Sequence, residues 1–259
     1  MIEKLLYIDA KDHEIPMQVV LPEGEGKFPT VLMLHGFLSA KNFDGHMLGR
    51  IAKALADNGI ASARIDFASM GENIYPRDKY GLKVMIKEVE ASFAYLQDQS
   101  FVDQERIGLL GHSLGGRIAF TCSYLPARLI VSLNGAVNTD EMLEPSYDKK
   151  AMEEHGYNIV TCSDGRIELL YQKFFDDMKA TLNKNIYDFQ NPILVCVADS
   201  DPTLDPNIGL GFIKSCGMKN VDHVIIHDAN HTFNAKTGDY TKLNELIVEL
   251  VPWIKQKMK

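Results

Sequence analysis

Short apolar runs that alternate with longer helical segments restrict the fold of this chain more than any other feature. The runs lack strict polar alternation, which is typical of strands buried on both faces of a sheet. They cover Met17 to Leu21, Thr30 to His35, Ile60 to Asp66, Arg106 to Gly111, Leu129 to Asn134, Ile193 to Ala198 and His223 to Asp228. Helical patterns cover His46 to Asn58, Gly81 to Gln99, Leu114 to Tyr124, Asn207 to Cys216 and Thr241 to Lys259. This alternation predicts an α/β fold with a doubly wound, mostly parallel sheet.

Glycines and a polar turn refine this prediction. Gly59 and Gly217 fit the stop position of two of the helices. Lys11 to Glu14 is a polar turn between two short runs that precede Pro29. The sheet is therefore expected to begin with antiparallel strands.

One stretch, residues 137–190, breaks the alternation and turns helical and polar, with candidate helices over Tyr147 to His155 and Arg166 to Thr181. No linker rich in Pro, Gly or Ser separates it from the rest. We expect a single domain, 1–259, in which 137–190 form a small helical cap. The cap aromatics are expected mainly to pack on the core, with pocket lining as the alternative. They are Tyr147, Tyr157, Tyr171, Phe174 and Phe175.

Composition excludes several classes of protein. With 46% hydrophobic and 24% charged residues among 259, the chain matches an ordinary globular protein with a large core. A formal charge of -8 argues against a surface for nucleic acid, which needs an excess of clustered Lys and Arg. The four cysteines form no C-x-x-C pair, so neither a zinc site nor a disulfide framework is expected.

Membrane and secretory signals are not expected from the sequence. Met1 to Glu14 already carries five charged residues before its last position, so it lacks the apolar stretch of a signal peptide. No later segment approaches the apolar length of a membrane span. These features predict a cytoplasmic protein with no membrane partner.

Residues Gly111 to Gly115 spell G-x-S-x-G between the apolar run Ile107 to Leu110 and a helical pattern. This strand–turn–helix context predicts a nucleophile elbow with Ser113 at its tip. The flanking glycines remove Cβ atoms that would clash in so tight a turn, and Gly116 permits close packing of the helix. Ser113 is the candidate nucleophile, whereas His112 is expected to be a packed neighbour.

A serine hydroxyl needs a neighbouring base at neutral pH, and in this architecture the base follows the nucleophile along the chain. His231 lies in the loop after the last predicted strand, where the end of the sheet would present it beside Ser113. His223 and His227 fall within that strand and are expected to be packed or edge histidines. His231 is therefore the candidate general base.

The base needs a carboxylate, which in the order Ser, Asp, His follows the strand Ile193 to Ala198. Asp199, Asp201 and Asp205 occur there. We favour Asp201, because Asp199 lies very close to the strand end for a turn toward His231; Asp199 and Asp205 remain alternatives.

The same acidic loop does not fit a calcium site of the EF-hand type. Counted from Asp199, the sixth position is Leu204 where Gly is required, and the twelfth is Leu210 where Glu is required. No metal is expected.

Acyl transfer also needs hydrogen-bond donors for the developing oxyanion. The backbone N–H of Leu114 follows the candidate nucleophile. The second donor should come from the loop after Thr30 to Leu34, where His35, Gly36 and Phe37 occur, and we select the N–H of Phe37.

The candidate residues and their motifs resemble the conserved motifs of α/β-hydrolase esterases, and the resemblance extends over nearly the whole chain. They are His35-Gly36-Phe37, Gly111 to Gly116, Asp201 and His231. Within that superfamily the chain most resembles bacterial carboxylesterases of the cinnamoyl or feruloyl esterase type. The resemblance implies aromatic acyl esters as candidate substrates. The chain departs from that group in having Ser69-Met70-Gly71 where such enzymes often carry Gly-His-Gly. Its cap is also closer to that of uncharacterised acyl hydrolases and serine-peptidase-like relatives.

These residues predict a cofactor-free serine hydrolase that cleaves a small carboxylic ester, with a short-chain or aromatic acyl group, through an acyl-enzyme. Thioester or peptide hydrolysis is the alternative within the same chemistry. A hydrolase-fold protein that only binds a ligand is the alternative outside it. The pattern leaves the oligomeric state open.

Overall fold

An eight-stranded mixed sheet forms the centre of the computed structural model, which describes residues 1–137, 147–162, 164–180 and 184–259. The strand order is β1-β2-β4-β3-β5-β6-β9-β10. The strands are β1 (Ile2–Asp9), β2 (Glu14–Leu21), β3 (Phe28–Leu34), β4 (Ala61–Ile65), β5 (Val102–His112), β6 (Ile130–Leu133), β9 (Ile193–Ala198) and β10 (Val221–Ile226). β2 runs antiparallel to both β1 and β4, and the other neighbours pair in parallel. The predicted α/β class and the antiparallel start are confirmed.

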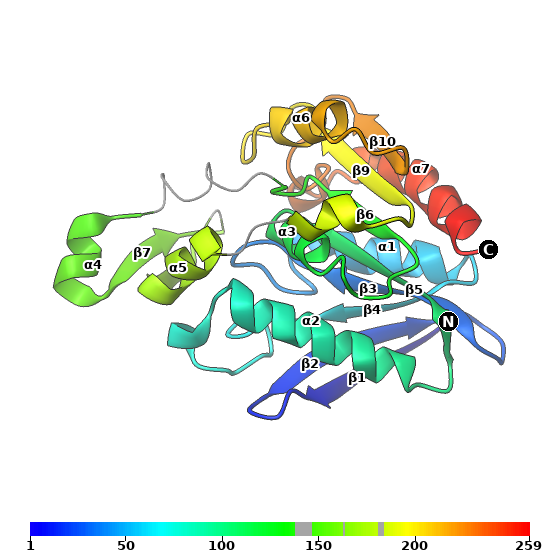
Figure 1. The fold of residues 1–259 in the computed structure, drawn as a ribbon, viewed down its shortest axis with the longest axis horizontal. Helices are drawn as coiled ribbons and strands as arrows, with labels where there is room; N and C mark the ends of the chain where they lie inside the picture. The colour runs from blue at the N-terminus through cyan, green and yellow to red at the C-terminus, as the bar shows by residue number, and fades with distance from the viewer. Residues whose placement is uncertain (138–146, 163, 181–183) are drawn as a thin grey trace.

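Helices cover both faces of this sheet (Figure 1). α1 (Met47–Ala56) and α7 (Thr241–Lys257) pack on one face, and α2 (Leu82–Gln97), α3 (Leu114–Thr121) and α6 (Asn207–Ser215) pack on the other. Short 3₁₀ helices cover Asp44–His46, Arg77–Lys79, Lys184–Asp188 and Ala235–Thr237. Gly59 and Gly217, both with positive φ, follow α1 and α6 closely, as predicted for helix stops.

The central strand β3 shows why the apolar runs lack alternation. Val31 and Met33 enter the core beneath α1 and α7, while Leu32 and Leu34 enter the core beneath α2 and α3. Successive side chains point to opposite faces, so a strand covered on both sides needs an apolar residue at every position. Each such side chain contributes about 1.5–3 kcal/mol by its burial.

The insertion after β6 contains α4 (Lys149–His155), β7 (Tyr157–Thr161), β8 (Ile167–Tyr171) and α5 (Gln172–Ala180). The first helix was predicted, and the side chain of Asp148 caps it by accepting a hydrogen bond from Ala151 N at 3.1 Å. The prediction of a purely helical cap was wrong, because β7 and β8 form a two-stranded antiparallel sheet. Figure 1 shows these elements to one side of the main sheet.

The correction concerns the candidate helix Arg166 to Thr181. Its first half is the strand β8, and only α5 is helical there. The sequence did contain the signal: Gly165, with φ 84°, follows Asp164 in a turn between two runs rich in β-branched and aromatic residues. Parts of the expected cap, residues 138–146, 163 and 181–183, lie outside the described residues.

Backbone strain gathers at one rim of the main sheet. Ten non-glycine residues of the described chain have positive φ, and nine of them lie in loops that follow the carboxyl ends of β3, β4, β5, β6 and β10. They are Leu38, Asp44, His46, Ser69, Ser113, Asn134, Asp228, Phe233 and Asn234. Such conformations are uncommon for residues with a Cβ atom, and they are found where the surrounding structure holds them.

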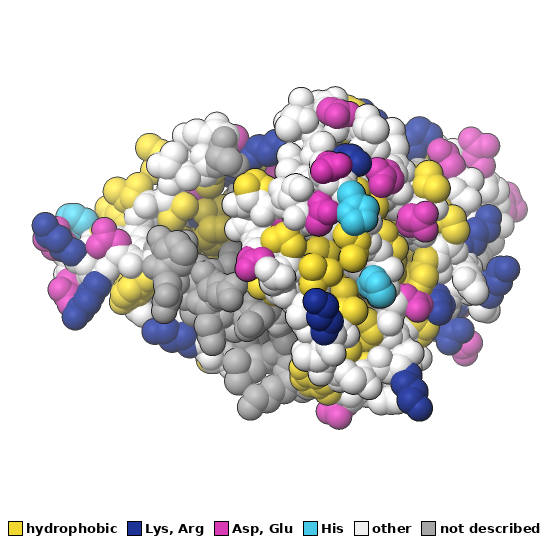
Figure 2. All heavy atoms as spheres, turned by 90° about the horizontal axis from the view of Figure 1, so that it is seen from above, with side chains coloured by type: hydrophobic (Ala, Val, Ile, Leu, Met, Phe, Trp, Pro, Cys, Tyr) yellow, Lys and Arg dark blue, Asp and Glu magenta, His cyan; other side chains and the backbone are white. Residues whose placement is uncertain are grey.

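Strand β10 forms one edge of the sheet and carries polar side chains on its exposed positions. Asp222 accepts a hydrogen bond from Trp253 Nε1 at 2.7 Å and pairs with Lys257 at 3.1 Å, which anchors α7 beside this edge. Figure 2, which looks down on this part of the molecule, shows hydrophobic side chains interspersed with charged ones and histidines. Charged residues on an edge strand disfavour pairing with strands of other molecules.

No helix in the described part of the chain combines the length and the apolar character needed to cross a bilayer.

Candidate active site

Ser113 occupies the sharp turn between β5 and α3, with φ 54° and ψ −118°. Four backbone hydrogen bonds hold this strained residue. Its N–H donates to Leu133 O at 2.9 Å, and its carbonyl accepts from Gly116 N and Ala136 N, both at 3.0 Å, and from Arg117 N at 3.3 Å. A strained residue of this kind costs about 1–3 kcal/mol, which the surrounding bonds offset. The elbow predicted for Ser113 is present, and the side chain reaches the surface of a cavity with 6% exposure.

The flanking glycines are required by close backbone contacts. A Cβ atom on Gly111 would lie 2.0 Å from Gly115 O, and one on Gly115 would lie 2.3 Å from Leu34 O. A Cβ on Gly36 would lie 3.2 Å from the Cβ of Ser113. The loop after β3 therefore passes directly over the elbow, and this is the loop in which Phe37 was predicted to act.

Asp201 and His231 are brought together as predicted. His231 Nδ1 lies 2.5 Å from Asp201 Oδ2. The other two acids of the loop have different partners: Asp199 binds His227 Nδ1 at 2.6 Å, and Asp205 accepts from Asn207 N at 2.9 Å, near the start of α6. Of the three candidate carboxylates, only Asp201 bonds His231.

The hydrogen bond to Asp201 determines the tautomer of His231. A carboxylate can only accept, so Nδ1 carries the proton and Nε2 is left as an acceptor. Asp201 Oδ1 also accepts from Thr203 N at 2.8 Å and Leu204 N at 3.0 Å. Burial alone would raise the pKa of Asp201. The hydrogen bond and the charge of His231, together with the hydrogen bonds from Leu204 N and Thr203 N, lower this pKa by more, so the net shift is downward. Asp201 is therefore held as a carboxylate.

His112 has a role that the sequence did not reveal. Its Nε2 donates to the backbone carbonyl of His231 at 2.9 Å, and Asn134 Nδ2 donates to the same oxygen at 2.9 Å. Burial, and then the neighbouring charge of His231, lowers the pKa of His112 to about 4. His112 is thus a neutral donor that fixes the main chain of the candidate base.

His35 fixes the loop that carries Phe37. Its Nδ1 donates to Gly36 O at 2.8 Å, while its Nε2 accepts from Phe67 N at 3.1 Å, and burial lowers its pKa. The N–H of a trans peptide points opposite to its carbonyl, so holding Gly36 O turns the N–H of Phe37 away from His35. No described residue accepts a hydrogen bond from this N–H. Leu114 is the first residue of α3, where N–H groups have no partner within the helix.

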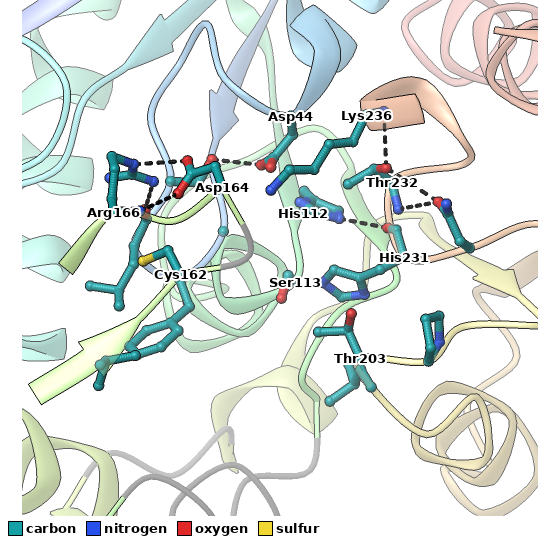
Figure 3. Close-up of a pocket in the computed structure, with 18 of the residues that line it drawn as sticks. Asp44, His112, Ser113, Cys162, Asp164, Arg166, Thr203, His231, Thr232 and Lys236 are labelled. Carbon is teal, nitrogen blue, oxygen red and sulfur yellow. Dashed lines mark hydrogen bonds and ion pairs between the residues drawn. The ribbon is translucent and has the colours of Figure 1, made fainter. Parts of the chain in front are cut away.

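A cavity of about 660 Å³ opens over Ser113 and His231 (Figure 3). Figure 3 shows the Ser113 hydroxyl and the His231 ring facing this cavity. One wall comes from Phe37 and its neighbours, a second from the loop of Pro202 to Leu204, and a third from the inserted hairpin. The hairpin contributes Val160, Thr161, Cys162, Asp164 and Arg166.

The five aromatics of the insertion do not belong to the described lining of this cavity. Phe174 and Phe175 are buried, and Phe174 stacks on Tyr80 with ring centres 5.5 Å apart. Packing of the insertion on the main domain was the role expected for these aromatics.

Within residues 1–137, 147–162, 164–180 and 184–259, no three His, Cys, Asp or Glu side chains gather in a way that could hold a metal ion.

Solved structures share this architecture. Est1E from Butyrivibrio proteoclasticus, in a structure with ferulic acid bound, superposes with a TM-score of 0.79 at 18% identity, over 98% of this chain and 99% of that one. At this identity the likeness establishes the fold, which is that of the α/β-hydrolases.

Curated sequences are also similar to this chain. An uncharacterised 31.7 kDa protein of Escherichia coli is 28% identical over 116 residues, which is 43% of this chain and 40% of that protein. The chain thus matches about two fifths of that relative's length. A probable 2-oxo-3-(5-oxofuran-2-ylidene)propanoate lactonase from a Bradyrhizobium species is 23% identical over 230 residues, which is 84% of this chain and 78% of that protein.

The profile of one protein family covers α2 and all later elements, including the elbow and the loops of Asp201 and His231. It matches residues 77–259, well over half of the chain. The chain belongs to the prolyl oligopeptidase family.

Proposed function

We propose that this protein is a serine hydrolase that cleaves carboxylic esters. Ser113 is the nucleophile, His231 the general base and Asp201 its orienting carboxylate, with the N–H groups of Phe37 and Leu114 as oxyanion donors. The observation that carries the proposal is the 2.5 Å contact between His231 and Asp201 in a cavity that Ser113 also lines. An esterase of this type needs no cofactor.

The proposed reaction has two steps. Ser113 Oγ attacks the ester carbonyl while His231 Nε2 takes its proton, and the oxyanion forms against the N–H groups of Phe37 and Leu114. The C–O bond to the alcohol then breaks, and His231 returns the proton to the departing alcohol. Water, activated by His231, next releases the acid from Ser113. Each oxyanion donor in such a site is worth about 10²–10³ in rate.

The size of the cavity supports a small substrate. Its volume of about 660 Å³ lies within the usual range for a small-molecule site, and it is large enough for an aromatic acyl group. The fold it shares with Est1E, which binds ferulic acid, supports including an aromatic ester among the test substrates.

The test is hydrolysis of p-nitrophenyl esters from acetate to laurate, together with methyl ferulate, by the parent protein and by Ser113→Ala. We expect turnover by the parent and none by the variant, with unchanged circular dichroism. Undiminished turnover by folded Ser113→Ala would overturn the assignment of Ser113. The order of rates along the series would define the acyl pocket.

Peptide hydrolysis is a second candidate, favoured by the match to the prolyl oligopeptidase family. Its chemistry uses the same residues but must expel an amine instead of an alcohol. A chromogenic Gly-Pro anilide and an acyl thioester distinguish the candidates. If no ester is hydrolysed but a fluorophosphonate still labels Ser113, the substrate would be assigned as a peptide or a thioester.

A further inference from the structure

Leu38 directly follows Phe37 and is held on both sides of its backbone. Its N–H donates to the hydroxyl of Tyr80 at 3.1 Å, and its carbonyl accepts from Arg166 Nη2 at 2.8 Å. Leu38 has φ 51°, a conformation that a leucine adopts only under constraint. The two hydrogen bonds supply that constraint, one from the loop before α2 and one from the inserted hairpin.

Ion pairs and a cation–π contact fix the side chain of Arg166 within the hairpin. Its Nε lies 2.8 Å from Asp164 Oδ2 and its Nη1 lies 2.9 Å from Glu168 Oε1, while its guanidinium lies 4.8 Å from the ring centre of Phe43. The side chain therefore has little freedom to turn away from the Leu38 carbonyl.

Glu168 links Arg166 to the residues that bond the Leu38 N–H. It pairs with Arg77 at 3.1 Å, and the guanidinium of Arg77 lies 4.5 Å from the ring centre of Tyr80, whose hydroxyl accepts from Leu38. Arg77 Nε also donates to Leu169 O on β8 at 2.9 Å. The hairpin, the loop before α2 and the Phe37–Leu38 segment are thus joined in one network.

We propose that Arg166 is a positioning residue that holds the Phe37 N–H in place from the inserted hairpin. The inference rests on the proposed function, because it assigns Phe37 as an oxyanion donor. His35 fixes the peptide before Phe37, and Arg166 with Tyr80 fixes the residue after it. The hairpin that lines the cavity therefore also sets the geometry of the oxyanion site, so changes in the hairpin act on turnover as well as on substrate binding.

The test compares Arg166→Met with a matched control, Arg106→Met, using p-nitrophenyl acetate. Arg106 has the same chemistry far from Ser113: its Nε lies 2.8 Å from Asp103 Oδ2, its Nη1 donates to Met258 O at 3.1 Å, and its side chain is 33% exposed, as is that of Arg166. For Arg166→Met we expect kcat to fall about 10- to 100-fold, with KM changed less than about 3-fold. Arg106→Met should keep the parent kcat.

A second measurement separates positioning from a general structural effect. Sulfur accepts hydrogen bonds weakly, so a well-formed oxyanion site favours an ester over its thiono analogue. The ratio of kcat/KM for the two should fall in Arg166→Met and stay at the parent value in Arg106→Met. Added guanidinium at millimolar concentration should restore part of the turnover of Arg166→Ala.

The outcomes are distinguishable. An active parent whose kcat and oxo/thiono ratio are unchanged by Arg166→Met overturns the positioning role. A parallel loss of kcat in both arginine variants, with the ratio unchanged, overturns it as well. A parent that neither hydrolyses esters nor reacts with a fluorophosphonate instead overturns the proposed function.

Discussion

His231 Nδ1 lies 2.5 Å from Asp201 Oδ2, whereas Asp199, two residues earlier, bonds His227. Two acids of the loop after β9 thus each bond a histidine of the loop after β10. Of these two histidines, only His231 faces the cavity with Ser113; His227 has a side chain that is 72% exposed.

This arrangement predicts a strong effect of Asp201→Asn. An amide in place of the carboxylate can favour the wrong tautomer of His231 and cannot stabilise the imidazolium. We expect kcat for p-nitrophenyl acetate to fall by a factor on the order of 10³–10⁴, with the thermal midpoint little changed. Asp199→Asn is the matched control and should retain the parent kcat within about 3-fold, because its pair lies on the surface. Equal losses in both variants would contradict the assignment of Asp201.

His112 should affect the rate without contributing an ionisation. In His112→Phe the His231 carbonyl loses one of its two donors, so the base is less well aligned and kcat/KM should fall about 10-fold. Because the pKa of His112 lies at about 4, His112 is neutral near neutral pH. The pH profile of kcat/KM should keep its inflection in the variant. A shifted acid limb would show that His112 itself titrates in the reaction.

Substitution by alanine at two glycines should have opposite effects on the free energy of unfolding. A Cβ on Gly111 would meet the backbone of Gly115, so Gly111→Ala should destabilise the fold by about 1–3 kcal/mol or more and slow labelling of Ser113. Gly211 lies within α6 with open space around its Cβ position, so Gly211→Ala should stabilise by about 0.5–1 kcal/mol. Urea unfolding and fluorophosphonate labelling measure both effects. Normal labelling of Gly111→Ala would mean that the turn does not need glycine there.

Stability should depend on pH through His13, which joins the β1–β2 turn to α2. Its Nε2 lies 2.7 Å from the buried Glu88, and its Nδ1 lies 2.8 Å from Asp12. The hydrogen bond to Glu88 is the largest cause that raises the pKa of His13, and Asp12 adds to it. A group with a raised pKa in the folded state stabilises the protein fully below its unfolded value of about 6.5, and this contribution disappears as the pH rises through the folded pKa.

The comparison is between the parent and His13→Gln in thermal unfolding. The parent should be more stable near about pH 6, and the difference should shrink as the pH is raised toward about 9. A difference that grows with pH would mean that His13 is neutral in the folded protein.

Central strands such as β3 and β9 were predictable from sequence, because they are buried on both faces and carry a largely apolar run. The run Ile193 to Ala198 matches β9 residue for residue. The positions of Ser113, Asp201 and His231 also followed, because the carboxyl ends of parallel strands meet at one rim of the sheet.

The hairpin and the supporting contacts were harder to predict. In β7 and β8 one face is largely open to solvent, so their apolar pattern is broken and also fits a helix. His112 and Arg166 act through backbone carbonyls 119 and 128 residues away in the chain. A backbone oxygen is present at every residue, so no sequence pattern marks such a partner.

The strained residues at the carboxyl rim have a consequence for engineering this protein. Glycine at Leu38 or Asn134 would relieve an unfavourable φ, yet Leu38 adjoins Phe37 and Asn134 holds the His231 carbonyl. Both exchanges would also remove other interactions, because Leu38 is buried in the core and the Asn134 side chain accepts a hydrogen bond from Ala198 N at 2.7 Å. The amino ends of the same strands, where Arg106 lies, are the place to make the molecule more robust without slowing it.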